Sequence, residues 1–160
     1  MFIFLKKILI TIITFMTLPF AWWWLRRNEK IALRLGRELN DEELLWAKQL
    51  EIQNPHKIRI LNVARIPSPV PEWIESFMQR RGFPVGTAAG MCMRYGIYLV
   101  EKYSHRKSLL AHEMVHTHQF ERLGGVWLFL REYLYQTLLL GYINAPLENE
   151  ANTKAEQVLV

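Results

Sequence analysis

Residues 112–116 of the chain read HEMVH, an HExxH sequence in which Glu113 directly follows the first of two histidines. The flanking residues from 109 to 123 contain no Pro or Gly that would break a helix. Because residues four apart lie one turn apart on a helix, the imidazoles of His112 and His116 can reach a single zinc ion. Glu113 lies at the edge of the same face, where it can accept a proton from water that the metal acidifies. The stretch predicts a zinc-dependent hydrolytic site with Glu113 as general base.

The same stretch contains a third histidine, His118. At about 100° per residue His118 points roughly opposite His116, which makes it a poor ligand for a shared ion. We interpret the histidines outside the HExxH sequence as solvated side chains: His56, His105 and His118.

Two histidines leave a tetrahedral zinc site one protein ligand short of a catalytic set. Two glutamates downstream compete for that position, in a segment where Asn144 or Ala145 can cap a helix and Pro146 can occupy its first turn. Glu148 would share a face of small, apolar residues suited to packing, whereas Glu150 would share a polar face suited to solvent. We therefore favour Glu148 as the third ligand. The alternatives are ligation by Glu150, or a Glu148 carboxylate that is there only because the helix dipole favours it.

Asn152 follows Glu148 by one helical turn. Its side chain could accept a hydrogen bond from a ligand imidazole and so fix the tautomer of that ring. A simple packing or surface role for Asn152 is the alternative.

The elements that must position these residues can be predicted from local patterns. Residues 96–100, GIYLV, form a short β-prone run just upstream of the HExxH helix. Residues 57–66 alternate apolar and polar side chains as a half-buried strand does. Capping residues, Pro and Gly predict helices over residues 40–55 and 71–82, and a loop among the glycines Gly82, Gly86 and Gly90.

Residues 124–143 are apolar enough to raise the question of a membrane span. Arg131 and Glu132 interrupt the middle of the segment, which is costly in lipid but ordinary in a core helix with one wet edge, so we favour a buried helix. The alternative is a metal-free protein with two membrane spans. That topology would separate His116 from Glu148 by roughly 30 Å of hydrocarbon and rule out shared ligation.

Residues 8–25 carry no charge, and a helix of this length, at about 1.5 Å per residue, just spans a bilayer core. The run Trp22 to Trp24 followed by Arg26 and Arg27 is typical of an interfacial aromatic belt with a charged stop. We favour a retained single-pass membrane anchor. A cleaved signal peptide and a buried core helix are the alternatives.

The predicted organisation is an anchor or signal over residues 1–27 and one metallopeptidase domain over residues 28–160. The side of the membrane stays open. Basic residues after the apolar run favour a cytoplasmic domain, whereas a short basic N-terminus with Lys6 and Lys7 is also how exported proteins begin.

Bulk composition limits the remaining choices. The 160 residues, 51% of them hydrophobic, suffice for one globular domain with a core. A single cysteine, Cys92, excludes an intrachain disulfide and a cysteine-based zinc site. The net charge of +5 is dispersed, and two of its three basic pairs flank the apolar segment, so we expect no nucleic-acid partner.

Two quoted stretches resemble known gluzincin metallopeptidases. ENEANTKA is similar to the E-x-x-A-D-x-x-A pattern of membrane-associated members, and GMCMRYGIYLV with LLAHEMVHTHQF resembles the G-x-x-I-x-L and LLAHELxHxxQ layout of small single-domain members. The resemblance covers roughly residues 90–155. It implies zinc ligation by His112, His116 and Glu148, with Glu113 as general base. The chain departs from the pattern at Asn152, where Asp is usual, and an amide orients an imidazole less strongly than a carboxylate does.

These observations predict an α+β fold: a minimal zincin-like domain, mostly helical with a small sheet beside the HExxH helix, preceded by an N-terminal transmembrane helix. The predicted activity is zinc-dependent hydrolysis of a peptide or protein substrate at a membrane. The alternative is a zinc-binding but inactive interaction scaffold at the membrane. Residues that could stabilise a transition state are Tyr95, Tyr103 and Tyr142.

Overall fold

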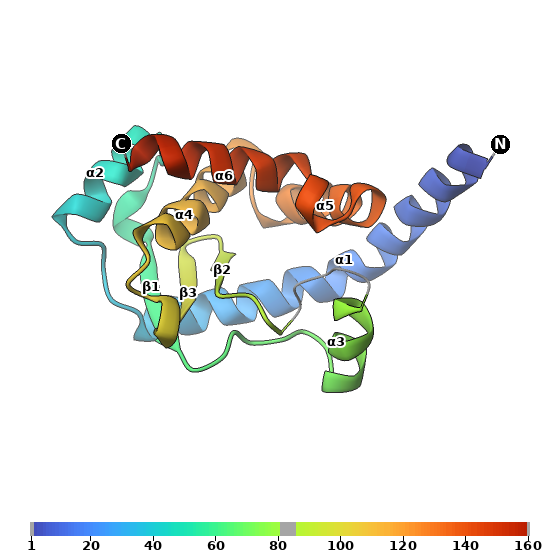
Figure 1. The fold of residues 1–160 in the computed structure, drawn as a ribbon, viewed down its shortest axis with the longest axis horizontal. Helices are drawn as coiled ribbons and strands as arrows, with labels where there is room; N and C mark the ends of the chain where they lie inside the picture. Colours follow the sequence, from blue (N-terminus) through green and yellow to red (C-terminus); the bar gives the residue numbers. More distant parts are fainter. Residues whose placement is uncertain (1, 81–85, 160) are drawn as a thin grey trace.

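The computed structural model describes residues 2–80 and 86–159 and has an α+β architecture in which helices predominate (Figure 1). The expected fold class is confirmed at this level. The elements are α1 (Phe2–Leu35), α2 (Asp41–Gln49), β1 (Arg59–Val63), α3 (Glu72–Gln79), β2 (Gly90–Met93), β3 (Gly96–Val100), α4 (Lys107–Arg122), α5 (Val126–Leu140) and α6 (Pro146–Val158), with short 3-10 turns at Pro55–Lys57, Glu101–Tyr103 and Tyr142–Asn144.

The sheet has three strands in the order β1-β3-β2. Strand β1 is parallel to β3, with Arg59 opposite Gly96, and β2 is antiparallel to β3, with Gly90 opposite Leu99. The predicted strand over residues 57–66 is confirmed in part, because β1 covers only its centre. Strand β2 was not predicted. It is too short for a recognisable alternation, and Cys92 and Met93 are adjacent and both buried.

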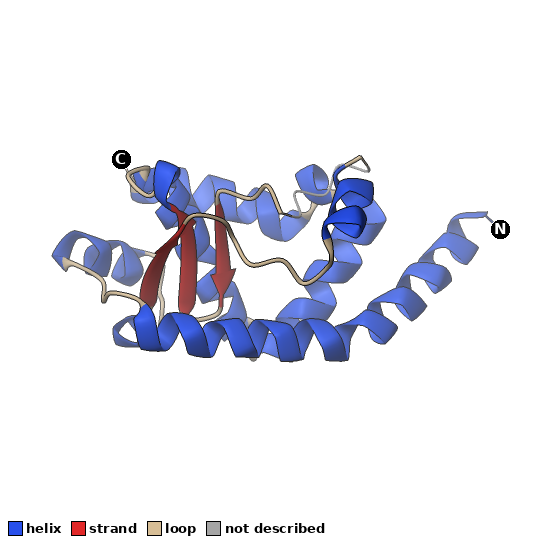
Figure 2. Cartoon of the chain, turned by 90° about the horizontal axis from the view of Figure 1, so that it is seen from below, coloured by secondary structure: helices blue, strands red, loops and turns tan. Residues whose placement is uncertain are grey.

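Helix α1 is longer than the apolar segment that the sequence singled out, and it continues unbroken past Arg27 to Leu35. Figure 2 shows it running beneath one end of the three strands. The approach is close there: a Cβ atom on Gly96 would lie 2.6 Å from the Cβ of Ala32. The hydroxyl of Tyr98 donates a hydrogen bond of 2.8 Å to the carbonyl of Asn28. The C-terminal part of α1 is therefore an integral part of the domain.

The N-terminal part of α1 packs against α5. The two helices are antiparallel, since Lys6 near the start of α1 donates a hydrogen bond from Nζ to the carbonyl of Leu139 near the end of α5. One face of α1 is buried, as shown by Ile10, Thr14 and Leu18. Its remaining surface is apolar, with exposed side chains that include Phe4, Leu5, Leu9, Ile12, Phe15, Met16, Phe20, Trp22 and Trp23. In the described part of the chain, α1 is the helix that is long and apolar enough to cross a membrane.

The other helices largely follow the sequence. Helix α2 begins with a capping box between Asn40 and Glu43 and ends at Gln49, earlier than expected, because Glu51 has a left-handed backbone with φ of 56°. Helix α3 occupies the predicted region, and its expected end at Gly82 lies outside the described residues. The predicted buried helix over residues 124–143 is α5, whose inward residues are Val126, Phe129, Leu130 and Thr137.

Candidate metal centre

Helix α4 carries the HExxH residues and is held in place along its whole length. Its centre is buried between the sheet and α6, with Met114, Val115 and Phe120 in the core. Thr117 donates a hydrogen bond of 2.7 Å to the carbonyl of Arg94 in the β2–β3 turn. At its C-terminal end, Glu121 accepts a hydrogen bond from the Tyr95 hydroxyl at 2.9 Å. These contacts fix the rotation of α4 about its axis and so decide which side chains face α6.

Helix α6 starts after Ala145 with Pro146 in its first turn, as the sequence predicted. It runs antiparallel to α4, because His112 contacts Asn152 whereas His116, one turn later, contacts Glu148. The facing surface of α6 is formed by small residues, with Ala151 and Ala155 buried. The small side chains allow the two helices to approach closely enough for the polar groups to meet.

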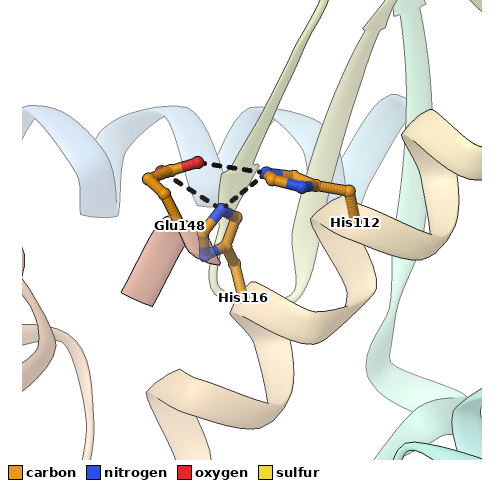
Figure 3. A group of neighbouring side chains, drawn as sticks. All are labelled: His112, His116 and Glu148. Atoms are coloured by element: carbon orange, nitrogen blue, oxygen red, sulfur yellow. Dashed lines mark hydrogen bonds and ion pairs between the residues drawn. The ribbon is translucent and has the colours of Figure 1, made fainter. Parts of the chain in front are cut away.

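Three predicted ligands converge where these helices meet (Figure 3). The Nε2 atoms of His112 and His116 are 3.1 Å apart. The carboxylate of Glu148 lies 3.3 Å from His112 Nε2 and 3.5 Å from His116 Nε2. Metal bonds of about 2.0–2.2 Å in a tetrahedron place neighbouring donors about 3.3–3.6 Å apart. The cluster of His112, His116 and Glu148 could therefore hold one metal ion.

The Glu148 carboxylate is buried, with 2% of the residue exposed, and is ready to bind a cation. Burial by itself raises its pKa, but the hydrogen bond with His112, the charge of His116 and the hydrogen bond from Tyr133 outweigh this and lower the pKa to about 2. Tyr133 on α5 donates its hydroxyl proton to Glu148 Oε1 at 2.6 Å. The carboxylate is ionised at neutral pH, as a metal ligand must be.

Glu113 lies beside this cluster, and its pKa is shifted in the opposite direction to that of Glu148. Its side chain is buried, and burial raises its pKa to about 7, an effect opposed by the charge of His112 and increased by that of Glu148. The backbone N–H of Cys92 in β2 donates a hydrogen bond to the Glu113 carboxylate. A carboxyl group with a pKa near neutrality can both accept and release a proton under physiological conditions.

A cavity of about 510 Å³ opens beside His112 and Glu113. One wall is formed by residues 87–90, which lead into strand β2. Asn152 and Ala155 of α6 and Tyr142 also line the cavity. The cavity gives solutes access to the side of the cluster that holds the candidate base.

The tyrosines that the sequence offered have different positions. Tyr142 lines the cavity and its hydroxyl hydrogen-bonds Glu148. The hydroxyl of Tyr95 is hydrogen-bonded to Glu121, and Tyr103 does not line the cavity. Tyr133, which directly contacts Glu148, was not predicted, because its position within α5 gave no signal of which other helix it faces.

The Nδ1 atoms of both histidines are hydrogen-bonded, and only one of these two hydrogen bonds was predicted. Asn152 Oδ1 lies 2.9 Å from His112 Nδ1, which is the contact the sequence predicted. Gln119 Oε1 lies 2.8 Å from His116 Nδ1, a contact that the sequence did not predict. Its three-residue spacing from His116 was the available signal.

Glu150 and His118 lie away from the cluster. The Glu150 carboxylate pairs with Arg122 at 2.6 and 2.7 Å and with Lys154 at 3.1 Å. His118 also points away from the cluster, but the expectation that it is simply solvated is wrong. It is half-buried, hydrogen-bonds the backbone of Glu51, and lies with Nε2 3.5 Å from Lys154 Nζ. His56 and His105 are exposed, as expected.

The separation of 3.5 Å between His116 and Glu148 also bears on the second-span alternative. Helix α5 connects the segments that carry these residues without separating them, which is incompatible with a bilayer crossing by α5 alone.

Comparison of the chain with family profiles, curated proteins and solved structures finds no match. The assignment of a function therefore rests on the geometry of the cluster, the cavity and α1.

Proposed function

We propose that the chain is a membrane-anchored zinc metallopeptidase, with His112, His116 and Glu148 as zinc ligands and Glu113 as general base. The observation that carries this proposal is the convergence of the three donor groups from α4 and α6, with Glu113 and the cavity directly beside them. The arrangement is the one that the resemblance to gluzincin peptidases implies, within a minimal zincin-like domain.

The donor set supports zinc as the metal. Two imidazole nitrogens and one carboxylate oxygen are a common ligand set for catalytic zinc, which keeps a further coordination position for water or substrate. The two Nε2 atoms are 3.1 Å apart, and the nearest carboxylate oxygens lie 3.3 Å from His112 Nε2 (Oε2) and 3.5 Å from His116 Nε2 (Oε1), which are distances near those between donors on one zinc ion. Zinc in such a site supplies Lewis-acid polarisation of the peptide carbonyl and acidifies water.

The residues of the chain supply proton transfer and positioning. Glu113, held by the N–H of Cys92, takes the proton of the attacking water and passes it to the leaving nitrogen of the peptide. Tyr142 lines the cavity and its hydroxyl hydrogen-bonds Glu148, so it would help to orient the carboxylate that binds the metal. Residues 87–90 line the cavity and lead into β2, the edge strand of the sheet, so an extended peptide substrate could lie along this wall.

The membrane assignment rests on α1. The exposed apolar side chains between Phe4 and Trp23 give way to Arg26 and Arg27, the order expected at a membrane boundary. We therefore assign a single-pass N-terminal anchor that keeps the metal centre close to the membrane.

The proposal is tested with the full chain in detergent micelles, loaded with zinc and incubated with denatured proteins and a peptide library. We expect Glu113→Gln to retain one zinc ion and to abolish cleavage, because an amide cannot accept the proton. Cleavage that survives this substitution would contradict the role of Glu113. A zinc-loaded wild-type chain that cleaves no substrate would instead favour an inactive zinc-binding scaffold at the membrane.

A further inference from the structure

We infer that Gln119 is a positioning residue that fixes the tautomer of His116 and so directs the Nε2 lone pair of that ring into the metal centre. The inference rests on the proposed zinc site and adds to it the means by which the deeper of the two histidines is prepared to bind metal. It follows from the hydrogen bonds around one buried amide.

The orientation of the Gln119 amide follows from its neighbours. Gln119 is fully buried, and its Nε2 atom lies 2.9 Å from the carbonyl of Leu147 and 3.0 Å from Glu150 Oε2. A carbonyl and a carboxylate only accept hydrogen bonds, so the atom facing both must be the amide nitrogen, which has two protons to donate. The reverse orientation would bring three oxygens together in a buried site.

The amide oxygen must therefore face His116, at 2.8 Å from Nδ1. Because an amide oxygen only accepts hydrogen bonds, Nδ1 of His116 must carry the proton. In a neutral imidazole this leaves Nε2 unprotonated, and its lone pair points toward His112 and Glu148. The ring is thus held as a metal ligand before any ion arrives.

Glu150 and Arg122 hold Gln119 in this orientation. The Glu150 carboxylate accepts two hydrogen bonds from the guanidinium of Arg122, so it remains ionised and oriented as an acceptor for the amide. The glutamate that competed with Glu148 in the sequence thus acts on the ligand His116 through Gln119. The bond to Leu147, the residue preceding Glu148, also ties α4 to the first turn of α6.

The two ligand histidines differ in how firmly the partner of their Nδ1 atom is held in place. The Nδ1 atom of His112 is hydrogen-bonded to Asn152, an exposed residue on the cavity wall. The Nδ1 atom of His116 is hydrogen-bonded to the buried amide of Gln119, which has further hydrogen bonds to Leu147 and Glu150. We therefore expect loss of Gln119 to affect metal binding more than loss of Asn152 does.

The test uses the full chain in micelles and two measurements. Long-range proton–nitrogen NMR of the histidine rings in metal-free protein reports the tautomer of His116, and competition with a chromophoric chelator reports zinc affinity. We expect Gln119→Met, which keeps the volume but removes the acceptor, to give a tautomer mixture at His116 and about 10–100-fold weaker zinc binding. The matched control Gln157→Met alters an exposed glutamine of α6 and should change neither.

A second variant distinguishes loss of the Gln119 hydrogen bond from a general disturbance of the core. Glu150→Gln leaves Gln119 in place but weakens its anchor, and should produce a smaller shift in both measurements. The inference is overturned if His116 keeps the Nδ1 proton and zinc affinity is unchanged in both variants. Failure of the wild-type chain to bind zinc would refute the proposed function, while the tautomer measurement would still decide the role of Gln119.

Discussion

Gly90 and Glu113 are in direct contact across the β2–α4 interface: a Cβ atom on Gly90 would lie 2.7 Å from Glu113 Oε1. The residue at the start of β2 therefore has to be glycine for the carboxylate of Glu113 to occupy its present position. The sequence marked Gly90 only as part of a loop.

The first prediction concerns this contact. We expect Gly90→Ala to displace the Glu113 carboxylate and to lower kcat about 100-fold, since small misplacements of a catalytic group cost this much. Zinc content should be unchanged, because the ligands are untouched. The control is Ala88→Gly on the same cavity wall, and an unaltered kcat in Gly90→Ala would contradict the assigned role of Glu113.

Removal of the Tyr133 hydroxyl should weaken the metal site. Its hydrogen bond to Glu148 helps to keep the pKa of this carboxyl at about 2, so Tyr133→Phe raises that pKa. Zinc release on acidification, followed by chelator fluorescence across a pH series, should then have its midpoint at higher pH than in the wild type. Tyr135→Phe, two residues along α5 from Tyr133 and so on roughly the opposite side of the helix, should leave the midpoint where it is. A shift of equal size there would indicate a general effect on the helix.

Metal removal should destabilise the fold. An ion that binds only the native state stabilises it by mass action, so a chelator should lower the Tm of the wild-type chain by several degrees. His116→Ala and Glu148→Ala should show no chelator-dependent change in Tm. His118→Ala should respond as the wild type does, because His118 points away from the cluster. Stoichiometric zinc in both ligand variants would overturn the assignment.

A pH dependence of stability is expected from Glu43. The bidentate pair with Arg37 and the N–H of Asn40 lower the pKa of this buried carboxyl against the effect of its burial. Because the folded pKa lies below the unfolded one, the stabilisation is complete above the unfolded value and is lost as pH falls through the folded value. Urea unfolding should show Glu43→Gln less stable by about 1–2 kcal/mol at pH 7. The difference should shrink in acid, whereas the exposed control Glu101→Gln should differ little at either pH.

The buried face of α1 can be tested with two neighbouring residues. Leu18 is fully buried and Met16 is 77% exposed. Leu18→Ala should lower the free energy of unfolding by about 2–5 kcal/mol, whereas Met16→Ala should cost much less. Chemical denaturation in micelles gives both values. Equal effects would mean that α1 acts only as an anchor and is not part of the core.

Sequence reasoning predicted those features of the site that depend on spacing within one helix. The four-residue separation of His112 and His116 specifies a shared face, and the periodicity of the last helix separates Glu148 from Glu150. Tyr133 was missed because it acts on a residue in another helix, and local periodicity does not indicate which helices are neighbours. Gln119 lies in the same helix as His116, but the contacts that orient its amide come from Leu147 and Glu150 of α6, which the periodicity of α4 does not indicate.

In the fold, too, elements defined by local sequence were predicted, and those that depend on contacts with distant residues were not. Helices α4 and α5 were predicted to within a few residues. The edge strand β2 was not, because four residues without alternation gain their strand conformation from pairing with β3. The apolar segment near the N-terminus was detected, but its continuation to Leu35 was not, because Asn28 and Glu29 contact residues far away in the sequence, Tyr98 in β3 and Tyr95 in the β2–β3 turn.

The ligands on α4 and α6 lie on either side of α5 in the sequence, although they meet in space. An ion bound by His116 and Glu148 would close the intervening chain into a loop, as a disulfide does, and would reduce the conformational entropy of that segment in locally opened states. Amide hydrogens of α5 would then exchange more slowly, and the Tyr142–Asn144 turn would be harder for a foreign protease to cleave. The metal would thus protect the helix that packs against α1, in addition to any part it has in hydrolysis.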